Sequence, residues 1–498
     1  MRQKLFVLFV ILVAASCTDQ NMDNSHPEGT TEFPGYNIKG SSISNDSGST
    51  GGGETYGEYE ENDFIKTEDE PQSTFSIDAD GGSYSNIRDQ INSGLEVERY
   101  SVRTEELINY FQYDYEDNSG YHPITLNGEI AQSPWSDNKL LRIGIKGKEI
   151  DFEDLPPSNL VLLIDVSGSM NMDNKLELLQ PAFKMLIDHL RDEDRVAIVT
   201  YASNPRVVLE STSCSDKATI KNAIDQLTSS GGTNGSGGIV KAYEIAEEYF
   251  VESGNNRIII ASDGDFNIGI TDHESLIDLI EEKREDGIFL TTIGVGRGNY
   301  NDANMEQIAN HGNGTYEYID DLRQAEKVFV EEYSKFYTVA KDVKVQVNFN
   351  PRLVEEYRLI GYENRVLENE DFEDDTKDAG EIGAGQTITA IYEFKPANIG
   401  IHPLSEETFN IDFRYKFPRE DQSILMHLSV VDRVIDFDKS SKDMQFACSM
   451  AALGMHLFDS KYKGDITINK IKDWVDDADS YDPNDYKEDL KKLLDKID

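Results

Sequence analysis

Continuous apolar runs alternate with amphipathic stretches over residues 158–338. Residues 159–165 and 257–263 are short apolar runs that each end on an aspartate, whereas residues 175–190 place apolar side chains three to four positions apart. Strands that are apolar throughout, alternating with amphipathic helices, indicate a parallel sheet covered by helices on both faces. We therefore expect a doubly wound, mostly parallel α/β domain here, with an edge strand near residues 206–211.

The segments on either side of this domain follow other patterns. Alternation of apolar and polar residues predicts strands near residues 124–146 and through residues 339–435. We interpret these strands as one β-sandwich into which the α/β domain is inserted. Helical spacing marks the first part of the N-terminal segment 74–157 and the whole C-terminal region 436–498. Three methionines of that last region are expected to pack in its core: Met444, Met450 and Met455.

The N-terminus has the features of a secretory signal peptide over residues 1–16. Arg2 and Lys4 precede the apolar run 5–13, which is too short to span a membrane. Small residues follow, and Cys17 ends them in a pattern that resembles a bacterial lipobox. The resemblance implies cleavage before Cys17, lipidation of that cysteine, and a lipid anchor in the bacterial cell envelope, on either the periplasmic or the surface face. Ordinary cleavage, which would release a soluble protein, stays the alternative.

Amino-acid composition and net charge indicate a disordered tether and exclude some classes of partner. Residues 17–73 are rich in Gly, Ser, Asn and acidic residues, so they are expected to form a disordered tether behind the lipid. The 498 residues include 47 Lys and Arg against 94 Asp and Glu, a net charge of −47. Such a charge repels nucleic acid and anionic membrane surfaces. We expect no nucleic-acid partner, and membrane contact through the lipid anchor only.

Cysteine usage argues against soft-metal chemistry. Besides Cys17 there are only Cys214 and Cys448, with no CxxC pair and no Cys/His cluster, which argues against zinc and iron–sulfur sites. Whether Cys214 and Cys448 form a disulfide stays open. Residues 368–381 are densely acidic and loosely similar to a calcium loop. They lack the regular ligand spacing of such loops, so a solvated loop is expected.

Oxygen-bearing side chains gather where the predicted strands end. Asp165 ends one strand and Asp263 another, and ligands of such sheets bind at the carboxyl ends of the strands. Ser167 and Ser169 follow Asp165, and Thr233 lies in a glycine-rich loop expected at the same edge. Carboxylates and hydroxyls are hard ligands that suit Mg²⁺, Mn²⁺ or Ca²⁺. Only two protein charges would offset the ion, and one coordination position could accept a carboxylate from a partner.

The same five residues give the chain its resemblance to von Willebrand factor A domains. Asp165-x-Ser167-x-Ser169, with Thr233 and Asp263 far along the chain, is similar to their metal-ion-dependent adhesion site. The resemblance implies that the serines, and in some states the threonine, bind the metal directly, while the aspartates often act through water. More widely, the chain resembles bacterial secreted proteins in which a central A domain lies between a family-specific N-terminal segment and a C-terminal domain of unknown function.

These observations leave three hypotheses about function. The first is a cell-envelope lipoprotein that binds an acidic side chain of a protein ligand through its metal. The second is a scaffold or assembly protein in which the metal is structural. The third is a metal-dependent hydrolase, which needs a general base beside the ion. The sequence offers no convincing base, so we expect no enzyme, no catalytic residue and no organic cofactor.

Overall fold

The computed structural model describes residues 54–117, 120–233, 235–264, 273–399, 405–478 and 481–497. The chain divides into two units, residues 1–33 and 34–498, and all described residues belong to the second. The expected signal peptide, Cys17 and the tether up to residue 53 lie outside the described residues.

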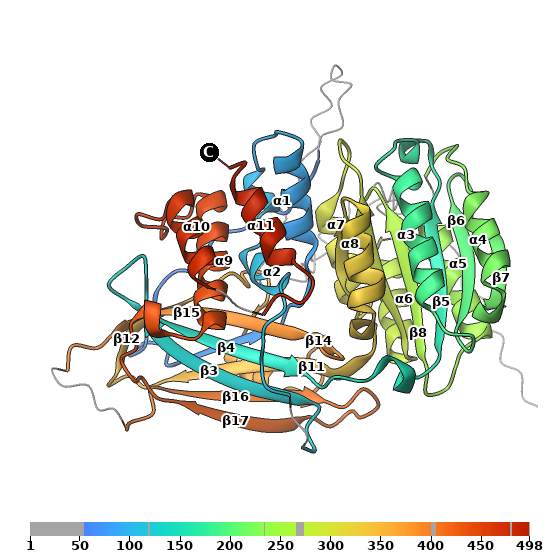
Figure 1. The fold of residues 1–498 in the computed structure, drawn as a ribbon. Coiled ribbons are helices and arrows are strands. Elements are labelled where there is room, and N and C mark those ends of the chain that lie inside the picture. Colours follow the sequence, from blue (N-terminus) through green and yellow to red (C-terminus); the bar gives the residue numbers. More distant parts are fainter. Residues whose placement is uncertain are drawn as a thin grey trace, which may run out of the picture. The chain divides into compact units, whose positions relative to one another are not determined.

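A six-stranded sheet forms the centre of the α/β domain (Figure 1). Its order is β10-β9-β8-β5-β6-β7, and all neighbours are parallel except β6 and β7. The strands are β5 (Ser158–Asp165), β6 (Arg195–Tyr201), β7 (Arg206–Ser213), β8 (Asn255–Ser262), β9 (Ile288–Val295) and β10 (Tyr316–Ile319). The doubly wound fold and its edge strand β7 are therefore confirmed.

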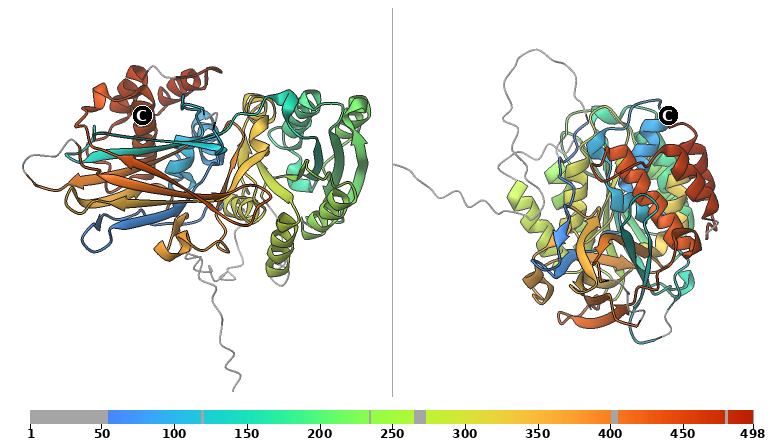
Figure 2. Two further views of the ribbon diagram at one scale, coloured as in Figure 1. Left: turned by 90° about the horizontal axis from the view of Figure 1, so that it is seen from below. Right: turned by 90° about the vertical axis from the view of Figure 1, so that its left-hand side faces the viewer.

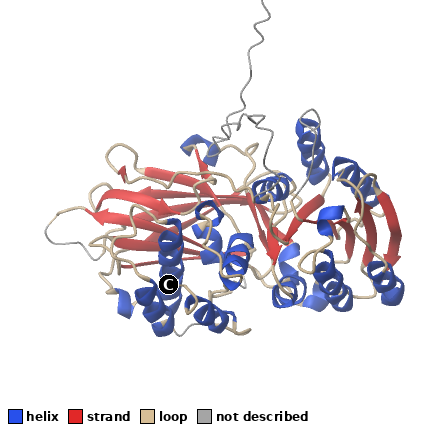
Figure 3. Cartoon of the chain, turned by 90° about the horizontal axis from the view of Figure 1, so that it is seen from above, coloured by secondary structure: helices blue, strands red, loops and turns tan. Residues whose placement is uncertain are grey.

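Helices cover both faces of this sheet, as Figure 3 shows by colour. Leu160, Leu162 and Ile164 of β5 pack toward one face, whereas Val161 and Leu163 pack toward the other. This alternation explains why β5 is apolar throughout, since each side chain has a covered face to pack into. One face holds α3 (Leu176–His189), α4 (Lys217–Asp225) and α8 (Leu322–Glu326); the other holds α5 (Gly235–Glu248), α6 (His273–Glu285) and α7 (Asp302–His311).

Two further sheets pack face to face as a β-sandwich whose core includes Phe75, Leu141, Val345 and Tyr392. One sheet has the order β1-β12-β15-β4-β3, with strands β1 (Ile65–Lys66), β12 (Val354–Ile360), β15 (Thr387–Pro396), β4 (Lys139–Gly147) and β3 (Ile124–Gln132). The other has the order β13-β2-β11-β16-β17, with strands β13 (Val366–Leu367), β2 (Gln72–Ser76), β11 (Thr338–Phe349), β16 (Phe409–Lys416) and β17 (Ile424–Val430), and β14 (Gly380–Gly383) pairs with β11.

The sandwich combines strands from both sides of the α/β domain. β4 pairs antiparallel with β15 from Lys139–Phe394 to Lys146–Thr387, and β2 pairs with β11. Figure 2 shows the same arrangement, with the early strands of the chain beside the late ones. The strands expected near residues 124–146 do join the sandwich, and the α/β domain is inserted within it.

Residues 54–73 differ from the expected tether. Strand β1 pairs with β12, and Thr55 forms a parallel bridge with Asn301. The Asn62 side chain donates to the carbonyl oxygens of Leu359 and Gly361, at 3.2 and 2.9 Å. Backbone pairing and polar side chains hold this stretch on the body. This stretch is therefore part of the fold, although its composition resembles that of a linker.

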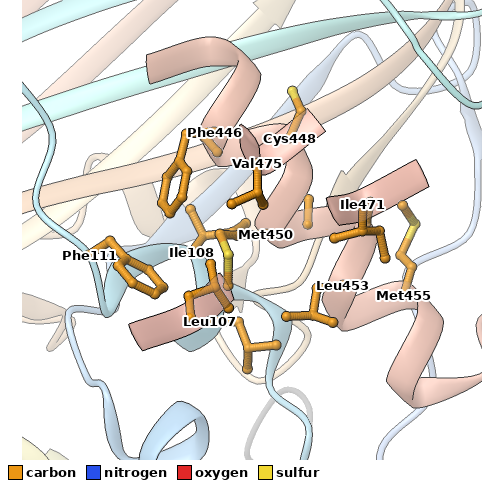
Figure 4. Close-up of a cluster of buried hydrophobic side chains, with 14 of the residues drawn as sticks. Leu107, Ile108, Phe111, Phe446, Cys448, Met450, Leu453, Met455, Ile471 and Val475 are labelled. Carbon is orange, nitrogen blue, oxygen red and sulfur yellow. The ribbon is translucent and has the colours of Figure 1, made fainter. Parts of the chain in front are cut away.

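A helical layer combines helices from the N-terminal segment with helices from the C-terminal region. It contains α1 (Gly82–Asn92), α2 (Thr104–Asn109), α9 (Lys442–Phe458), α10 (Ile468–Asp477) and α11 (Tyr486–Leu494). Ser441 caps α9 by accepting from the Met444 amide at 3.1 Å, and Asp459 ends the helix in the left-handed conformation. Figure 4 shows the shared core, in which Leu107 and Ile108 of α2 meet Met450 and Leu453 of α9.

The methionines and the two downstream cysteines have clear positions in the structure. Met444, Met450 and Met455 are buried in the helical core, as expected. Cys214 and Cys448 are both buried and free, so they do not pair. No helix among the residues that the structure describes is both long and apolar enough to cross a membrane.

The acidic stretch 368–381 surrounds two lysines. The Lys344 ammonium donates to the carbonyl oxygens of Asp371, at 3.0 Å, and Asp374. The Lys416 ammonium donates to the carbonyl oxygen of Asp375 at 2.6 Å. Backbone carbonyl groups that a calcium loop would direct at its ion therefore bind ammonium groups of the sandwich.

Leu453→Ala tests the helical layer. Leu453 is only 2% exposed, so truncation leaves a cavity and should lower the free energy of unfolding by about 2–5 kcal/mol in urea titrations. Leu425→Ala is the control, because Leu425 is 40% exposed on strand β17 and its truncation should cost under about 0.5 kcal/mol. Equal losses for the two variants would contradict this account of the core.

Candidate metal centre

The carboxyl end of β5 forms the centre of the candidate site. Asp165 is fully buried, and its Oδ1 accepts from the Ser167 amide at 2.8 Å. Its Oδ2 accepts from the Ser262 hydroxyl, on neighbouring β8, at 3.1 Å. The Ser167 and Ser169 hydroxyl oxygens lie 3.0 Å apart. One carboxylate and two hydroxyl groups therefore lie together at the end of the strand.

Asp263 joins the same group of side chains from the end of β8. It is fully buried, and the nearby Ser169 hydroxyl contributes to lowering its pKa. The Lys175 ammonium donates to Asp263 Oδ2 at 2.9 Å, and both side chains are inaccessible to solvent. Asn299 donates to the same oxygen at 3.2 Å. Hydrogen bonds thus join Asp165, Ser167 and Ser169, and Asp263 directly follows Ser262, whose hydroxyl donates to Asp165.

Thr233 lies in the loop that approaches from the other side. The Gly231 carbonyl oxygen accepts from the Gly168 amide at 3.1 Å, and the Ser230 amide donates to the Val166 carbonyl oxygen at 2.7 Å. These bonds attach the loop to the Asp165–Ser169 turn, and Thr233 follows two residues after Gly231, half-buried. The loop of the fifth predicted ligand is therefore beside the other four.

The electrostatics of the two aspartates differ. Burial raises the pKa of Asp165 to about 6, and the nearby charge of Asp263 adds to this effect. Burial also acts to raise the pKa of Asp263, but its interactions with Lys175 and Ser169 outweigh this effect and lower the pKa overall. Asp165 is therefore a buried carboxyl group whose charged form is disfavoured until a proton or a cation neutralises it.

This donor set fits a hard divalent cation. Carboxylate and hydroxyl oxygens are the ligands that Mg²⁺, Mn²⁺ and Ca²⁺ prefer, and all of them come from loops at one sheet edge. Asp165 would supply the charge that most needs neutralising, while Asp263 already has an ammonium partner. A proton would compete with the cation for Asp165 below about pH 6.

Lys175 and Asn299 contact the site but were not predicted from the sequence. Lys175 directly precedes helix α3, where a lysine ordinarily extends into solvent, and Asn299 lies in the loop after β9 that carries two glycines. Gly296, far along the chain from Lys175, marks the turn that the lysine packs against. Its φ is +72°, and a Cβ there would come within 2.3 Å of Lys175 Cγ, so the turn needs glycine for both conformation and space.

Comparisons with known proteins agree with this architecture. Residues 159–331 match the family model described as von Willebrand factor type A domain, and residues 50–142 match one described as von Willebrand factor. Residues 334–498 match the model described as uncharacterized protein YfbK, C-terminal.

Individual relatives cover different shares of the chain. Uncharacterized protein YfbK of Escherichia coli is 40% identical over 467 residues, which are 89% of this chain and 81% of YfbK. Uncharacterized protein sll0103 of Synechocystis is 28% identical over 209 residues, 42% of this chain and 48% of that protein. A solved structure, von Willebrand factor type A from Catenulispora acidiphila, covers 77% of this chain and 91% of its own, with 18% identity and a TM-score of 0.43.

The match to YfbK covers 89% of this chain, and the three family models together match residues 50–142, 159–331 and 334–498. The chain therefore belongs to the YfbK family, whose central part is a von Willebrand factor type A domain.

Proposed function

We propose that this protein is a cell-envelope lipoprotein that binds a protein ligand through a divalent metal. Asp165, Ser167, Ser169, Thr233 and Asp263 would hold the ion, and a carboxylate of the ligand would complete its coordination. The observation that carries the proposal is the group of hydrogen bonds that joins Asp165, Ser167 and Ser169 at one edge of the sheet, with Asp263 next to the Ser262 that donates to Asp165. Von Willebrand factor type A domains generally mediate protein–protein interactions, which supports a binding role.

The protein groups give the site its character. Ser167 and Ser169 offer neutral hydroxyl oxygens, so they bind a cation without reducing its charge. Among the described residues, the hydrogen-bond donors to the Asp165 carboxylate are neutral groups, the Ser167 amide and the Ser262 hydroxyl. The Asp263 carboxylate differs, because it accepts from the Lys175 ammonium. When bound, Mg²⁺ or Mn²⁺ would supply a Lewis acid with a position open to an oxygen ligand.

The rim of the site suits a protein ligand. Met172 lies in the loop that follows Ser169 and is 54% exposed, and Gly231 and Gly232 are exposed on the facing loop. An exposed methionine gives a partner surface an adaptable apolar contact beside the polar centre. With a net charge of −47, the protein would repel an acidic ligand, so the metal would be essential for that binding.

Capture experiments test this function. The wild-type protein is expected to retain a partner from detergent-solubilised envelope extracts in Mg²⁺, to release it in EDTA, and to recover it when Mg²⁺ is restored. Replacing the acidic residues of the identified partner one at a time should locate the residue that binds the metal. Capture that is equally strong in EDTA would contradict the proposal.

A structural role for the metal is the second candidate. The interactions of Asp263 with Lys175 and Asn299 support it, because they connect the loops after β5, β8 and β9. In that case the melting temperature would rise with Mg²⁺ while capture persisted in EDTA. The same protein preparation therefore separates the two roles.

A further inference from the structure

Lys175 is built into the candidate site rather than placed beside it. Its ammonium donates to Asp263 Oδ2 at 2.9 Å and to Asn299 Oδ1 at 2.8 Å, and Asn299 donates to Asp263 Oδ2 at 3.2 Å. The three side chains form a closed triangle. The Lys175 and Asp263 side chains are both 0% exposed, so water does not screen their interaction.

The surrounding backbone reserves space for this lysine. A Cβ on Gly296 would come within 2.3, 2.5 and 2.9 Å of Lys175 Cγ, Cε and Cδ, so the aliphatic part of the side chain lies directly against the turn after β9. The Lys175 backbone also accepts from the Leu178 and Leu179 amides, which fixes it at the start of α3. The ammonium is therefore held in place from both ends of the side chain.

Lys175 changes the net formal charge of the metal-bound site. Asp165 and Asp263 together carry two negative charges, and Lys175 returns one positive charge. With a divalent cation the site would have a net charge of +1, whereas without the lysine it would be neutral. Inside a protein such a difference is large, because the interior screens charges weakly.

We propose that Lys175 sets the specificity of the metal centre: it neutralises Asp263, keeps the bound cation weakly held and electrophilic, and thereby selects an anionic ligand. This inference rests on the proposed function. Lys175 acts through Asp263 and Asn299, so it is a positioning residue and not a metal ligand. The ligand class that follows is a carboxylate or another small oxyanion group.

Two variants change the charge in the same direction by different chemistry. Lys175→Met removes the ammonium while keeping the apolar stem, and Asn299→Asp leaves the lysine but adds a carboxylate to the triangle. Lys139→Met is the matched control, because Lys139 forms a buried ion pair with Asp432 in the sandwich. The second variant keeps the test valid if Lys175→Met does not fold.

The first measurement is Mn²⁺ affinity by titration calorimetry, with the Mn²⁺-dependent rise in melting temperature beside it. Both charge variants are expected to bind Mn²⁺ roughly ten-fold more tightly than wild type, because each makes the charge near the cation more negative by one unit. Both should also show a larger Mn²⁺-dependent rise in melting temperature. The control should bind Mn²⁺ as wild type does. A merely structural lysine would lower the melting temperature without changing the Mn²⁺ affinity.

The second measurement uses acetate as the carboxylate probe on the Mn²⁺-loaded proteins, followed by water proton relaxation. Acetate should bind the loaded wild type roughly ten-fold more tightly than either charge variant. Unchanged Mn²⁺ and acetate affinities in both variants would overturn the inference and leave the proposed function standing. Failure of the wild type to take up Mn²⁺ would instead overturn the proposed function, and the inference with it.

Discussion

Replacing Asp165 with asparagine is expected to weaken the binding of divalent metal strongly while leaving the fold intact. In the wild-type protein the Ser167 amide donates to Asp165 Oδ1 at 2.8 Å. The variant loses the buried negative charge but keeps a side-chain oxygen that can accept this hydrogen bond. Burial disfavours the charged form of Asp165, so removing the charge should cost the metal-free protein little. We expect the Mn²⁺ affinity to fall roughly 100-fold. Removing a residue that only orients a metal ligand already lowers metal affinity by about 10- to 100-fold, so the loss of a ligand should cost at least as much.

Calorimetric titration with Mn²⁺ and Mg²⁺ measures this effect, and circular dichroism melting in EDTA checks the fold. Asp225→Asn is the control on the same domain, because Asp225 is exposed and pairs only with Lys184 among the described residues. Its metal affinity should equal that of wild type. Normal Mn²⁺ binding by the Asp165 variant would show that the site does not hold metal through this carboxylate.

Arg103→Met is expected to give the largest loss of stability. Arg103 follows α1 in the N-terminal segment, and its guanidinium forms ion pairs with Glu106 of α2 and Asp302 of α7. A third carboxylate, Glu306, lies 3.6 Å from Nη1. The arginine side chain is only 6% exposed. Methionine would leave three buried carboxylates without this partner, and breaking such a cluster costs about 3–5 kcal/mol.

Urea unfolding monitored by fluorescence and by circular dichroism measures this loss. Arg352→Met is the control, because Arg352 pairs with Glu406 but is 74% exposed, and solvent-exposed pairs contribute under about 1 kcal/mol. If Arg103→Met were no more destabilising than the control, the N-terminal segment would not depend on this cluster for its attachment to the α/β domain.

Much of the fold follows from local sequence patterns. Strands β5 and β8 are predictable because each is a short apolar run between polar turns, and both faces of their sheet are covered. The parallel order then places Asp165 and Asp263 at one edge without further information. Strand direction therefore made Asp165 and Asp263 predictable, whereas Thr233 lies in the loop between helices α4 and α5.

Other features have no local signal. Ser73 of β2 pairs with Val347 of β11, and no pattern near either residue indicates a partner so distant in the chain. Residues 54–73 attach through backbone bonds that composition does not encode. Lys175 resembles any lysine at the start of a helix, and its burial depends on a turn that contains Gly296, far along the chain. Tertiary contacts, and not propensity, decide these cases.

The divided origin of the sandwich has a consequence for biosynthesis. Strands β2, β3 and β4 leave the ribosome before their partner strands β11 and β15 have been translated. About 190 residues separate β4 from β11, which at cellular elongation rates means a delay of roughly 10–40 s. The inserted domain can fold during this interval, while the early strands wait with unpaired edges. Nascent chains are therefore expected to depend on chaperones until the strands from residue 338 onward have been translated.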